Sequence, residues 1–195
     1  MPAWVVIGIG YLLGSVPTAY LAGRVLKKTD IRTLGDENAG AANAYRELGK
    51  WTGVTVYIID VAKGAAVILI ARAAGMDQTV VLLTGAAAVI GHAFPVYLGF
   101  RGGRGVSVLI GTLYVLVPVP ALIITVPVLL IVYFMRSTTP ALAFLFIVLI
   151  LLDWWCNIPF WVIVYQTGMA AFTGIVTLFR TRKEAAEETE NHLAD

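Results

Sequence analysis

Residues 91–106 read Gly91-His92-Ala93-Phe94-Pro95-Val96-Tyr97-Leu98-Gly99-Phe100-Arg101-Gly102-Gly103-Arg104-Gly105-Val106, which sets two arginines among closely spaced glycines between two apolar runs. Glycine has no Cβ atom, so its backbone reaches positive φ angles and exposes N–H groups, and the guanidinium of arginine matches the oxygens of a phosphate. This stretch is therefore a candidate loop for binding an oxyanion. The alternative is a tight membrane turn whose arginines orient the chain and contact lipid headgroups.

The composition indicates an integral membrane protein. The chain has 195 residues, of which 59% are hydrophobic and 13% are charged, and its mean hydropathy is +0.84. Soluble domains carry about 25% charged residues. The basic residues lie between apolar segments and not on a soluble surface, so we expect no nucleic-acid partner. The single cysteine, Cys156, lies in an apolar run and leaves no partner for an internal disulfide.

Apolar runs divide the chain into about seven expected membrane-spanning helices. Three runs near the length that a bilayer requires cover residues 3–26, 51–74 and 79–98. The run 106–135 is too long for one upright helix and contains Pro118 and Pro120, so we expect two helices there. The remaining spans are expected at residues 138–153 and 157–179. The expected fold class is an all-α integral membrane protein.

Basic residues in the connections predict the orientation, because Lys and Arg are retained on the cytoplasmic side. With the N-terminus outside, the inner side holds Lys27, Lys28, Arg32, Arg46, Lys50, Arg101, Arg104, Arg136, Arg180, Arg182 and Lys183. The outer connections hold only Arg72. We therefore expect an N-terminus outside and a C-terminus in the cytoplasm. We expect one transmembrane domain over residues 1–180 and a polar cytoplasmic tail over residues 181–195.

A long polar connection, residues 27–50, separates the first two spans and is the second informative stretch. Its small residues and its asparagines, Asn38 and Asn43, let a backbone fold close to a ligand. Residues 41–48 are expected to form one or two helical turns that aim Asn43 and Arg46 in a similar direction. A connection of this length is usually functional or disordered. The alternative is an interfacial helix with ordinary surface polarity.

Ionisable residues within the spans are functional candidates, because a charge inside a membrane is costly. Asp60 and Lys63 lie at i and i+3 on one helical face and are expected to pair, either in support of a site or as a packing device between helices. His92 is a candidate base, a candidate phosphate donor or a structural histidine. The sequence has no HExxH motif, P-loop or GxSxG elbow, so we expect no metal site, NTP hydrolysis or serine chemistry.

Four groups of residues, taken in order, resemble one family. They are Gly14-Ser15-Val16-Pro17, then Asn38-Ala39-Gly40-Ala41-Ala42-Asn43 with Arg46 and Leu48-Gly49-Lys50, then Asp60-x-x-Lys63-Gly64, and finally Gly91-His92-x-Phe94-Pro95 with Phe100-x-Gly102-Gly103-x-Gly105-Val106. The chain resembles the bacterial membrane glycerol-3-phosphate acyltransferases that use acyl phosphate, the PlsY family. The resemblance implies a seven-span, multi-pass enzyme of the bacterial inner membrane. Such an enzyme moves an acyl chain from acyl phosphate to the 1-hydroxyl of glycerol 3-phosphate and forms lysophosphatidic acid in phospholipid synthesis.

The resemblance also implies roles for individual residues. The catalytic residues would be Asn38, Asn43 and Arg104. The substrate-binding residues would be Arg46, Arg101, Gly40, Gly102, Gly103, Gly105, His92 and Arg182, with structural support from Asp60, Lys63 and Ser15. Backbone N–H groups around Gly102, Gly103 and Gly105 are expected to stabilise the acyl phosphate and the oxyanion formed on attack.

The expected partners are acyl phosphate, glycerol 3-phosphate and membrane lipid. Because acyl phosphate is already activated, positioning two substrates can supply much of the rate without a covalent enzyme intermediate. We therefore expect no cofactor and no metal. The sequence leaves the oligomeric state open, a monomer included.

The chain departs from the family pattern at several site positions. Asp36-Glu37 stands where the family has Ser-Gly, Ala42 stands where it has Thr, and Arg104 replaces Lys. The segment 180–184 keeps arginine but lacks the family's His and Asn. Two carboxylates near a dianion are repulsive unless they point away or pair with the arginines. These departures favour an alternative, a non-catalytic or altered-acceptor relative that binds a phosphorylated lipid or anion. A third interpretation is a small transporter, in which paired intramembrane charges would line a path.

Overall fold

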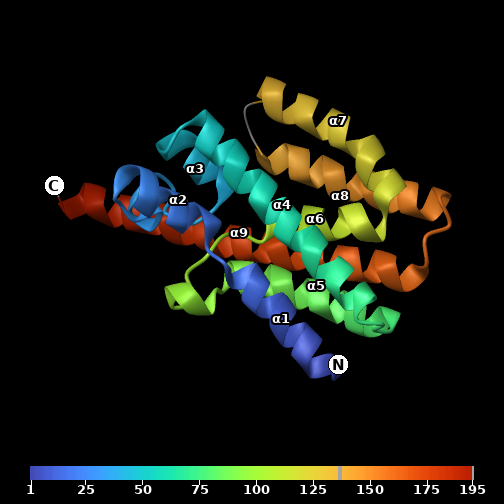
Figure 1. Cartoon of the computed structure of the whole chain (residues 1–195). Coiled ribbons are helices and arrows are strands. Elements are labelled where there is room, and N and C mark those ends of the chain that lie inside the picture. Colours follow the sequence, from blue (N-terminus) through green and yellow to red (C-terminus); the bar gives the residue numbers. More distant parts are fainter. Residues whose placement is uncertain (136–137, 195) are drawn as a thin grey trace.

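The computed structural model describes residues 1–135 and 138–194, and these ranges contain helices and their connections but no strand. The α-helices are α1 (Ala3–Ser15), α2 (Thr18–Lys27), α3 (Ala41–Glu47), α4 (Lys50–Ala73), α5 (Gln78–Ala93), α6 (Val106–Leu116), α7 (Pro118–Met135), α8 (Thr138–Trp155) and α9 (Phe160–Ala194), with short 3₁₀ helices η1 (Ile31–Thr33) and η2 (Val96–Leu98) (Figure 1). The predicted all-α fold is confirmed for the described residues. Arg136 lies outside them.

Four helical segments are long and apolar enough to cross a bilayer within the described part of the chain. They are Ala3–Lys27, Lys50–Ala73, Gln78–Leu98 and Phe160–Arg182. Shorter apolar helices lie at Val106–Leu116, Pro118–Val128 and Phe144–Trp155. Each expected span overlaps one of these segments. The backbone of α9 continues through the expected tail as far as Ala194, so the tail begins as an extension of the last helix.

Prolines set two of the helix boundaries. The expected first span is broken into α1 and α2, because Pro17 has no N–H and keeps Val16 out of the helical region, with ψ 116°. The expected division of residues 106–135 is confirmed, since α6 ends at Leu116 and α7 begins with Pro118. Proline is tolerated at the first position of a helix because its missing N–H would have no partner there.

Glycines bring pairs of helix backbones into direct contact. The most extensive helix contacts join α1 with α5 and α4 with α6. A Cβ atom at Gly14 would lie 2.1 Å from the carbonyl oxygen of Ala88, and one at Gly64 would lie 2.1 Å from that of Val108. Lipid gives little hydrophobic driving force for helix association, so membrane helices rely on such close packing of small residues.

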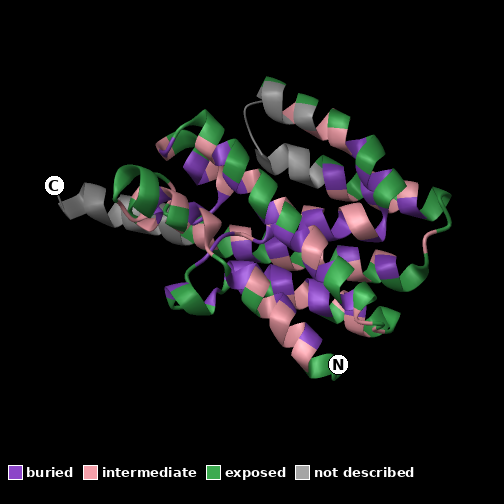
Figure 2. Cartoon of the chain, viewed as in Figure 1, coloured by how far each residue is buried: buried purple, intermediate pink, exposed green. Residues whose placement is uncertain are grey.

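The outer faces of the helices remain apolar. Figure 2 shows buried residues concentrated in the middle of the bundle and exposed residues around it. The exposed residues include the large apolar side chains of Leu69, Leu122, Val126, Ile147 and Phe179. So much exposed apolar surface is unusual for a protein in water and suits a protein surrounded by lipid.

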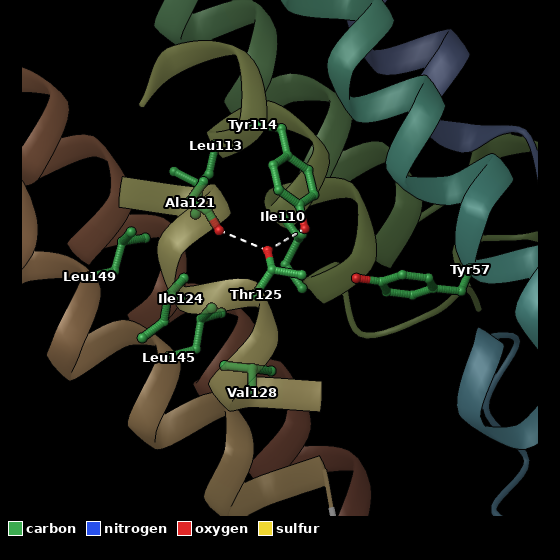
Figure 3. A pocket seen from close by; sticks show the side chains of 10 residues that line it. All are labelled: Tyr57, Ile110, Leu113, Tyr114, Ala121, Ile124, Thr125, Val128, Leu145 and Leu149. Carbon is green, nitrogen blue, oxygen red and sulfur yellow. Dashed lines mark hydrogen bonds between the residues drawn. The ribbon is translucent and has the colours of Figure 1, made fainter. Parts of the chain in front are cut away.

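A small pocket of about 30 Å³ lies between α4, α6, α7 and α8 (Figure 3). Its only polar contacts among the residues drawn join the hydroxyls of Tyr114 and Thr125 at 2.6 Å and the Thr125 hydroxyl to the carbonyl of Ala121 at 2.7 Å. This volume holds about two water molecules. No lining residue is charged, so the pocket does not suit a phosphate.

The polar residues predicted to form a site lie at one end of the bundle. Figure 1 shows α2, α3, η2 and the C-terminal part of α9 at that end, and the α4–α5 and α8–α9 connections at the other. We call the first end, which comprises residues 27–50, residues 94–105 and the part of α9 around residue 180, the polar end. The long connection between α2 and α4 and the glycine-rich connection before α6 meet there.

Gly64→Ala should lower the free energy of unfolding by about 1–3 kcal/mol, because the added Cβ would collide with a backbone oxygen of α6 that no side-chain rotation can move. Thermal unfolding of the purified protein in detergent micelles measures the change. The matched control is Gly168→Ala in α9, where an added Cβ would meet nothing within 4 Å. Alanine is the better helix former, so the control should be as stable as the wild type or more stable. Equal stability of both variants would contradict the close-packing account.

Candidate active site

Asn43 fixes the shape of the connection between α2 and α4. Its side chain is fully buried, and Nδ2 donates to the carbonyl oxygens of Ile31 at 3.2 Å, Leu34 at 2.8 Å and Asn38 at 3.1 Å. Buried carbonyls in an irregular segment need such partners, because no helix or sheet supplies them. Asn43 therefore holds three points of the connection against α3.

Asp36 joins two arginines that come from different segments of the chain. Its Oδ2 lies 2.6 Å from Nη2 of Arg46, on α3, and 3.5 Å from Nη2 of Arg104, just before α6. The backbone N–H of the buried Asn38 lies 3.4 Å from the other Asp36 oxygen. The structure thus brings together Asn38, Arg46 and Arg104 and pairs the unexpected carboxylate with both guanidinium groups.

The predicted short helix over residues 41–48 is confirmed as α3, and the two side chains expected to act together both face the connection that precedes it. The side chain of Asn43 is fully buried, whereas the side chain of Arg46 is 51% exposed. The short amide therefore reaches the backbone, and the longer guanidinium reaches the surface carboxylate.

Arg180 of α9 holds the glycine loop, residues 94–105. Its Nη1 donates to the carbonyls of Gly102 and Gly103 at 2.5 and 2.7 Å, and its Nη2 donates to that of Ala93 at 2.7 Å. The N–H groups of Gly102 and Gly103 themselves donate to the carbonyls of Ala93 and His92, at 3.3 and 3.0 Å. These two N–H groups were expected to face the substrate, but in this structure they donate to the backbone of α5.

The N-terminus of α6 lies beside the same loop. Gly105 precedes the helix with a φ of 87°, a conformation that side chains rarely adopt. The first N–H groups of a helix have no intrahelical acceptor and carry a partial positive charge. Gly103 packs on the His92 ring so closely that an added Cβ would lie 2.1 Å from Nε2. The backbone N–H groups that follow Gly105 therefore lie at a helix N-terminus, whereas those of Gly102 and Gly103 donate to the backbone of α5.

A buried polar cluster lies next to the start of the glycine loop and to the break between α1 and α2. Lys63 Nζ lies 2.8 Å from Asp60 Oδ1, donates to the carbonyl of Val16 at 2.8 Å and lies 3.1 Å from His92 Nδ1. The hydroxyl of Thr18 donates to Asp60 Oδ1 at 2.9 Å. The predicted pairing of Asp60 with Lys63 is confirmed, and the cluster links α4 with α5 and with the break between α1 and α2.

The remaining predicted site residues differ in burial. Arg101 and Arg182 are exposed, and neither contacts Asp36 among the described ion pairs. Gly40 precedes α3, where an added Cβ would lie 2.8 Å from Nδ2 of Asn38. Ser15 is buried at the end of α1 against Gly91. Their roles stay predictions.

A second arginine, Arg32, ties the glycine loop to the connection after α2. Its Nη1 donates to the carbonyl of Leu98 at 3.1 Å, and its Nε and Nη2 donate to Asp30 at 3.0 and 2.8 Å. The side-chain hydrogen bonds from Arg32 hold the pKa of Asp30 below its ordinary value. Sequence reasoning used Arg32 only to orient the chain, and it used Arg180 for orientation and as an arginine kept in the segment 180–184. Their acceptors are backbone carbonyls, which no sequence pattern marks.

Comparisons with known proteins identify the family of this chain. The sequence pattern of the family described as glycerol-3-phosphate acyltransferase matches residues 4–188. A relative named glycerol-3-phosphate acyltransferase 4, from Dehalococcoides mccartyi, is 42% identical over 175 residues, which cover 90% of this chain and 95% of the relative. A glycerol-3-phosphate acyltransferase of Synechococcus sp. (strain CC9605) is 46% identical over 105 residues, which cover 54% of this chain and 52% of the relative.

Two solved structures share the fold. The crystal structure of PlsY (YgiH), an integral membrane glycerol 3-phosphate acyltransferase, in its glycerol 3-phosphate form has a TM-score of 0.79 and 31% sequence identity to this chain. The lysophosphatidic acid form gives the same TM-score at 29% identity, and each comparison covers 97% of this chain and 92% of the other. Because sequence and fold both match over nearly the whole chain, this protein belongs to the glycerol-3-phosphate acyltransferase family, the membrane acyltransferases of phospholipid synthesis.

Proposed function

We propose that the protein transfers an acyl chain from acyl phosphate to the 1-hydroxyl of glycerol 3-phosphate and releases lysophosphatidic acid and inorganic phosphate. The meeting of Arg46 and Arg104 at Asp36 is the observation that carries this proposal. Both substrates bear phosphate, and guanidinium groups bind phosphate through paired, charge-assisted hydrogen bonds. The glycerol 3-phosphate and lysophosphatidic acid forms of the related PlsY support the acceptor and the product.

The reaction needs positioning more than it needs a nucleophilic side chain. The hydroxyl oxygen attacks the acyl carbonyl carbon, the bond from that carbon to the phosphate oxygen breaks, and phosphate leaves with the electron pair. The hydroxyl proton passes to a phosphate oxygen of the substrates. Effective molarities of well-oriented groups are large enough to supply much of the rate, so the proposal needs no cofactor and no covalent intermediate.

Each part of the polar end has a role in this proposal. Arg46 and Arg104 neutralise the phosphates, with Arg101 at the edge of the same loop. The N–H groups that follow Gly105 stabilise the oxyanion, because they are fixed donors at a helix N-terminus. Asn38 lies beside Asp36 and contacts the substrates. Asn43 acts through the backbone that it holds.

We further propose a multi-pass protein of the bacterial inner membrane with seven spans, formed by α1 with α2, α4, α5, α6, α7, α8 and α9. The N-terminus lies outside, the polar end and the tail over residues 181–195 lie in the cytoplasm, and residues 1–180 form one domain. The positions of Arg32, Arg46, Arg104 and Arg180 at one end of the bundle support this orientation, because basic residues are retained inside.

Cys156 gives a direct test of the orientation. It is the chain's single cysteine and is exposed in the α8–α9 connection, on the proposed outer side. A membrane-impermeant maleimide should label it in intact cells. A Cys156→Ser, Thr181→Cys variant places the cysteine at the exposed Thr181 in the inner part of α9. That variant should be labelled only after the membrane is permeabilised, and the reverse pattern would invert the proposed topology.

Assays of the purified protein test the reaction. With acyl phosphate and labelled glycerol 3-phosphate we expect lysophosphatidic acid, and with an acyl thioester of the same chain length we expect none. Arg46→Ala and Arg104→Ala should each lower kcat/KM about 10- to 100-fold, because hydrogen bonds to charged groups contribute about 1.5–3 kcal/mol.

Lys28→Asn is the matched control for these arginine variants. It removes one positive charge from the same end of the protein, its side chain is exposed, and asparagine tolerates the φ of 53° found there. Its kcat/KM should equal that of the wild type. Product formation from the thioester alone would overturn the proposed donor.

Arg180 is proposed as a positioning residue that acts through the glycine loop. Arg180→Ala should lower kcat/KM about 10- to 100-fold, because small displacements of a positioned group have effects of this size. Added guanidinium ion should restore part of the activity, and Arg180→Lys should be intermediate because an ammonium cannot copy the planar donor geometry. A Thr181→Ala control should behave as wild type. Loss of thermal stability without rescue by guanidinium would leave Arg180 a purely structural role.

A further inference from the structure

Asp36 occupies the place between the two arginines that a phosphate would use. One of its oxygens contacts Nη2 of both Arg46 and Arg104, at 2.6 and 3.5 Å. The Asp36 side chain is 25% exposed, beside 51% for Arg46 and 22% for Arg104, so solvent reaches all three groups. An anion that binds both guanidinium groups from outside must therefore share them with Asp36 or displace it.

The backbone around Asp36 allows such a displacement. Gly35 and Glu37 flank it with φ angles of 57° and 51°, so the residue lies in a tight turn between two left-handed positions. Both neighbours are exposed. The bond between the Asn38 N–H and the second Asp36 oxygen is long, at 3.4 Å. The hydrogen bond from the Asn38 backbone is therefore a weak restraint on the Asp36 carboxylate.

Charge decides which anions can compete with Asp36. A carboxylate and a monoanion carry equal charge, and the carboxylate is tethered to the chain, so it keeps the arginine pair against a monoanion in free solution. A phosphate dianion carries twice the charge and offers three oxygens to the two guanidinium groups. An exposed ion pair is also weak on its own. A dianion should therefore displace Asp36 from the two arginines, whereas a monoanion should not.

We propose that Asp36 is a specificity-determining residue, a tethered anion that competes with the substrate phosphate for Arg46 and Arg104 and excludes singly charged anions from the pair. This inference rests on the proposed function, because it assigns the arginine pair to a substrate phosphate. It adds that the chain's own carboxylate lowers the affinity for that phosphate. The side chain takes no part in the chemical step.

The test compares Asp36→Asn with Glu37→Gln. The neighbouring glutamate is exposed, so its change removes the same charge at the same place without touching the arginine pair. In Asp36→Asn the KM for glycerol 3-phosphate should fall about two- to fivefold with kcat changed less than twofold, since loss of a competing exposed ion pair is worth up to about fivefold in affinity. In Glu37→Gln both constants should stay at the wild-type values.

A singly charged probe tests the exclusion directly. Methanesulfonate, a tetrahedral monoanion, should inhibit Asp36→Asn and leave the wild type unaffected at the same concentration. Inorganic phosphate should inhibit both proteins, and the variant more strongly. Asp36→Ser is the second variant if Asp36→Asn does not fold, and it should show the same fall in KM and the same sensitivity to methanesulfonate.

Three outcomes would overturn the inference. An unchanged KM in folded Asp36→Asn would show that the carboxylate does not compete. An equal fall in KM for Glu37→Gln would show a general charge effect. A tenfold loss of kcat would make Asp36 a catalytic base. If the wild type forms no product at all, the proposed function fails, and calorimetric titration of glycerol 3-phosphate into wild type and Asp36→Asn still tests the competition.

Discussion

The ammonium group of Lys63 is the contact on which the polar end depends. Pro17 breaks the first span, and the carbonyl of Val16 at this break accepts a hydrogen bond from the Thr18 N–H at 3.1 Å and a second one from Lys63. Lys63 donates to it and pairs with Asp60 on its own helix. Its contact with His92 reaches the start of the glycine loop. One buried cation therefore connects α4 with the break in the first span and with the last turn of α5, next to the glycine loop.

Close packing of the helices at glycines allows these short-range contacts to form. A lysine side chain spans only a few ångströms, so α4 must lie near both the broken first span and α5. Gly14 against α5 and Gly64 against α6 bring the backbones to distances that any larger residue would prevent. The glycines thus set the distance between the helices, and the buried Asp60–Lys63 pair determines which face of α4 contacts its neighbours.

The sequence predicted the helices and the contacts between residues close in the chain better than the contacts between residues far apart in it. Each span expected from hydropathy overlaps an apolar helix of the described chain, Pro118 located the division between α6 and α7, and the spacing of Asp60 and Lys63 predicted their pairing. Hydropathy missed the break at Pro17, because the apolar run continues across it. The acceptors of Arg180 are backbone carbonyls far away in the sequence, and a carbonyl is common to every residue, so no pattern could identify them.

The arginines of the polar end differ in the kind of acceptor they contact, and this difference separates scaffold from site. Arg32 and Arg180 donate to backbone carbonyls, which cannot leave without moving the glycine loop. Arg46 and Arg104 contact a side-chain carboxylate, which can rotate away while the backbone stays folded. A substrate phosphate can therefore exchange with the second pair at much lower conformational cost. Positive charge alone does not distinguish these four arginines, whereas the acceptor that each one contacts supports the proposal that Arg46 and Arg104 bind phosphate.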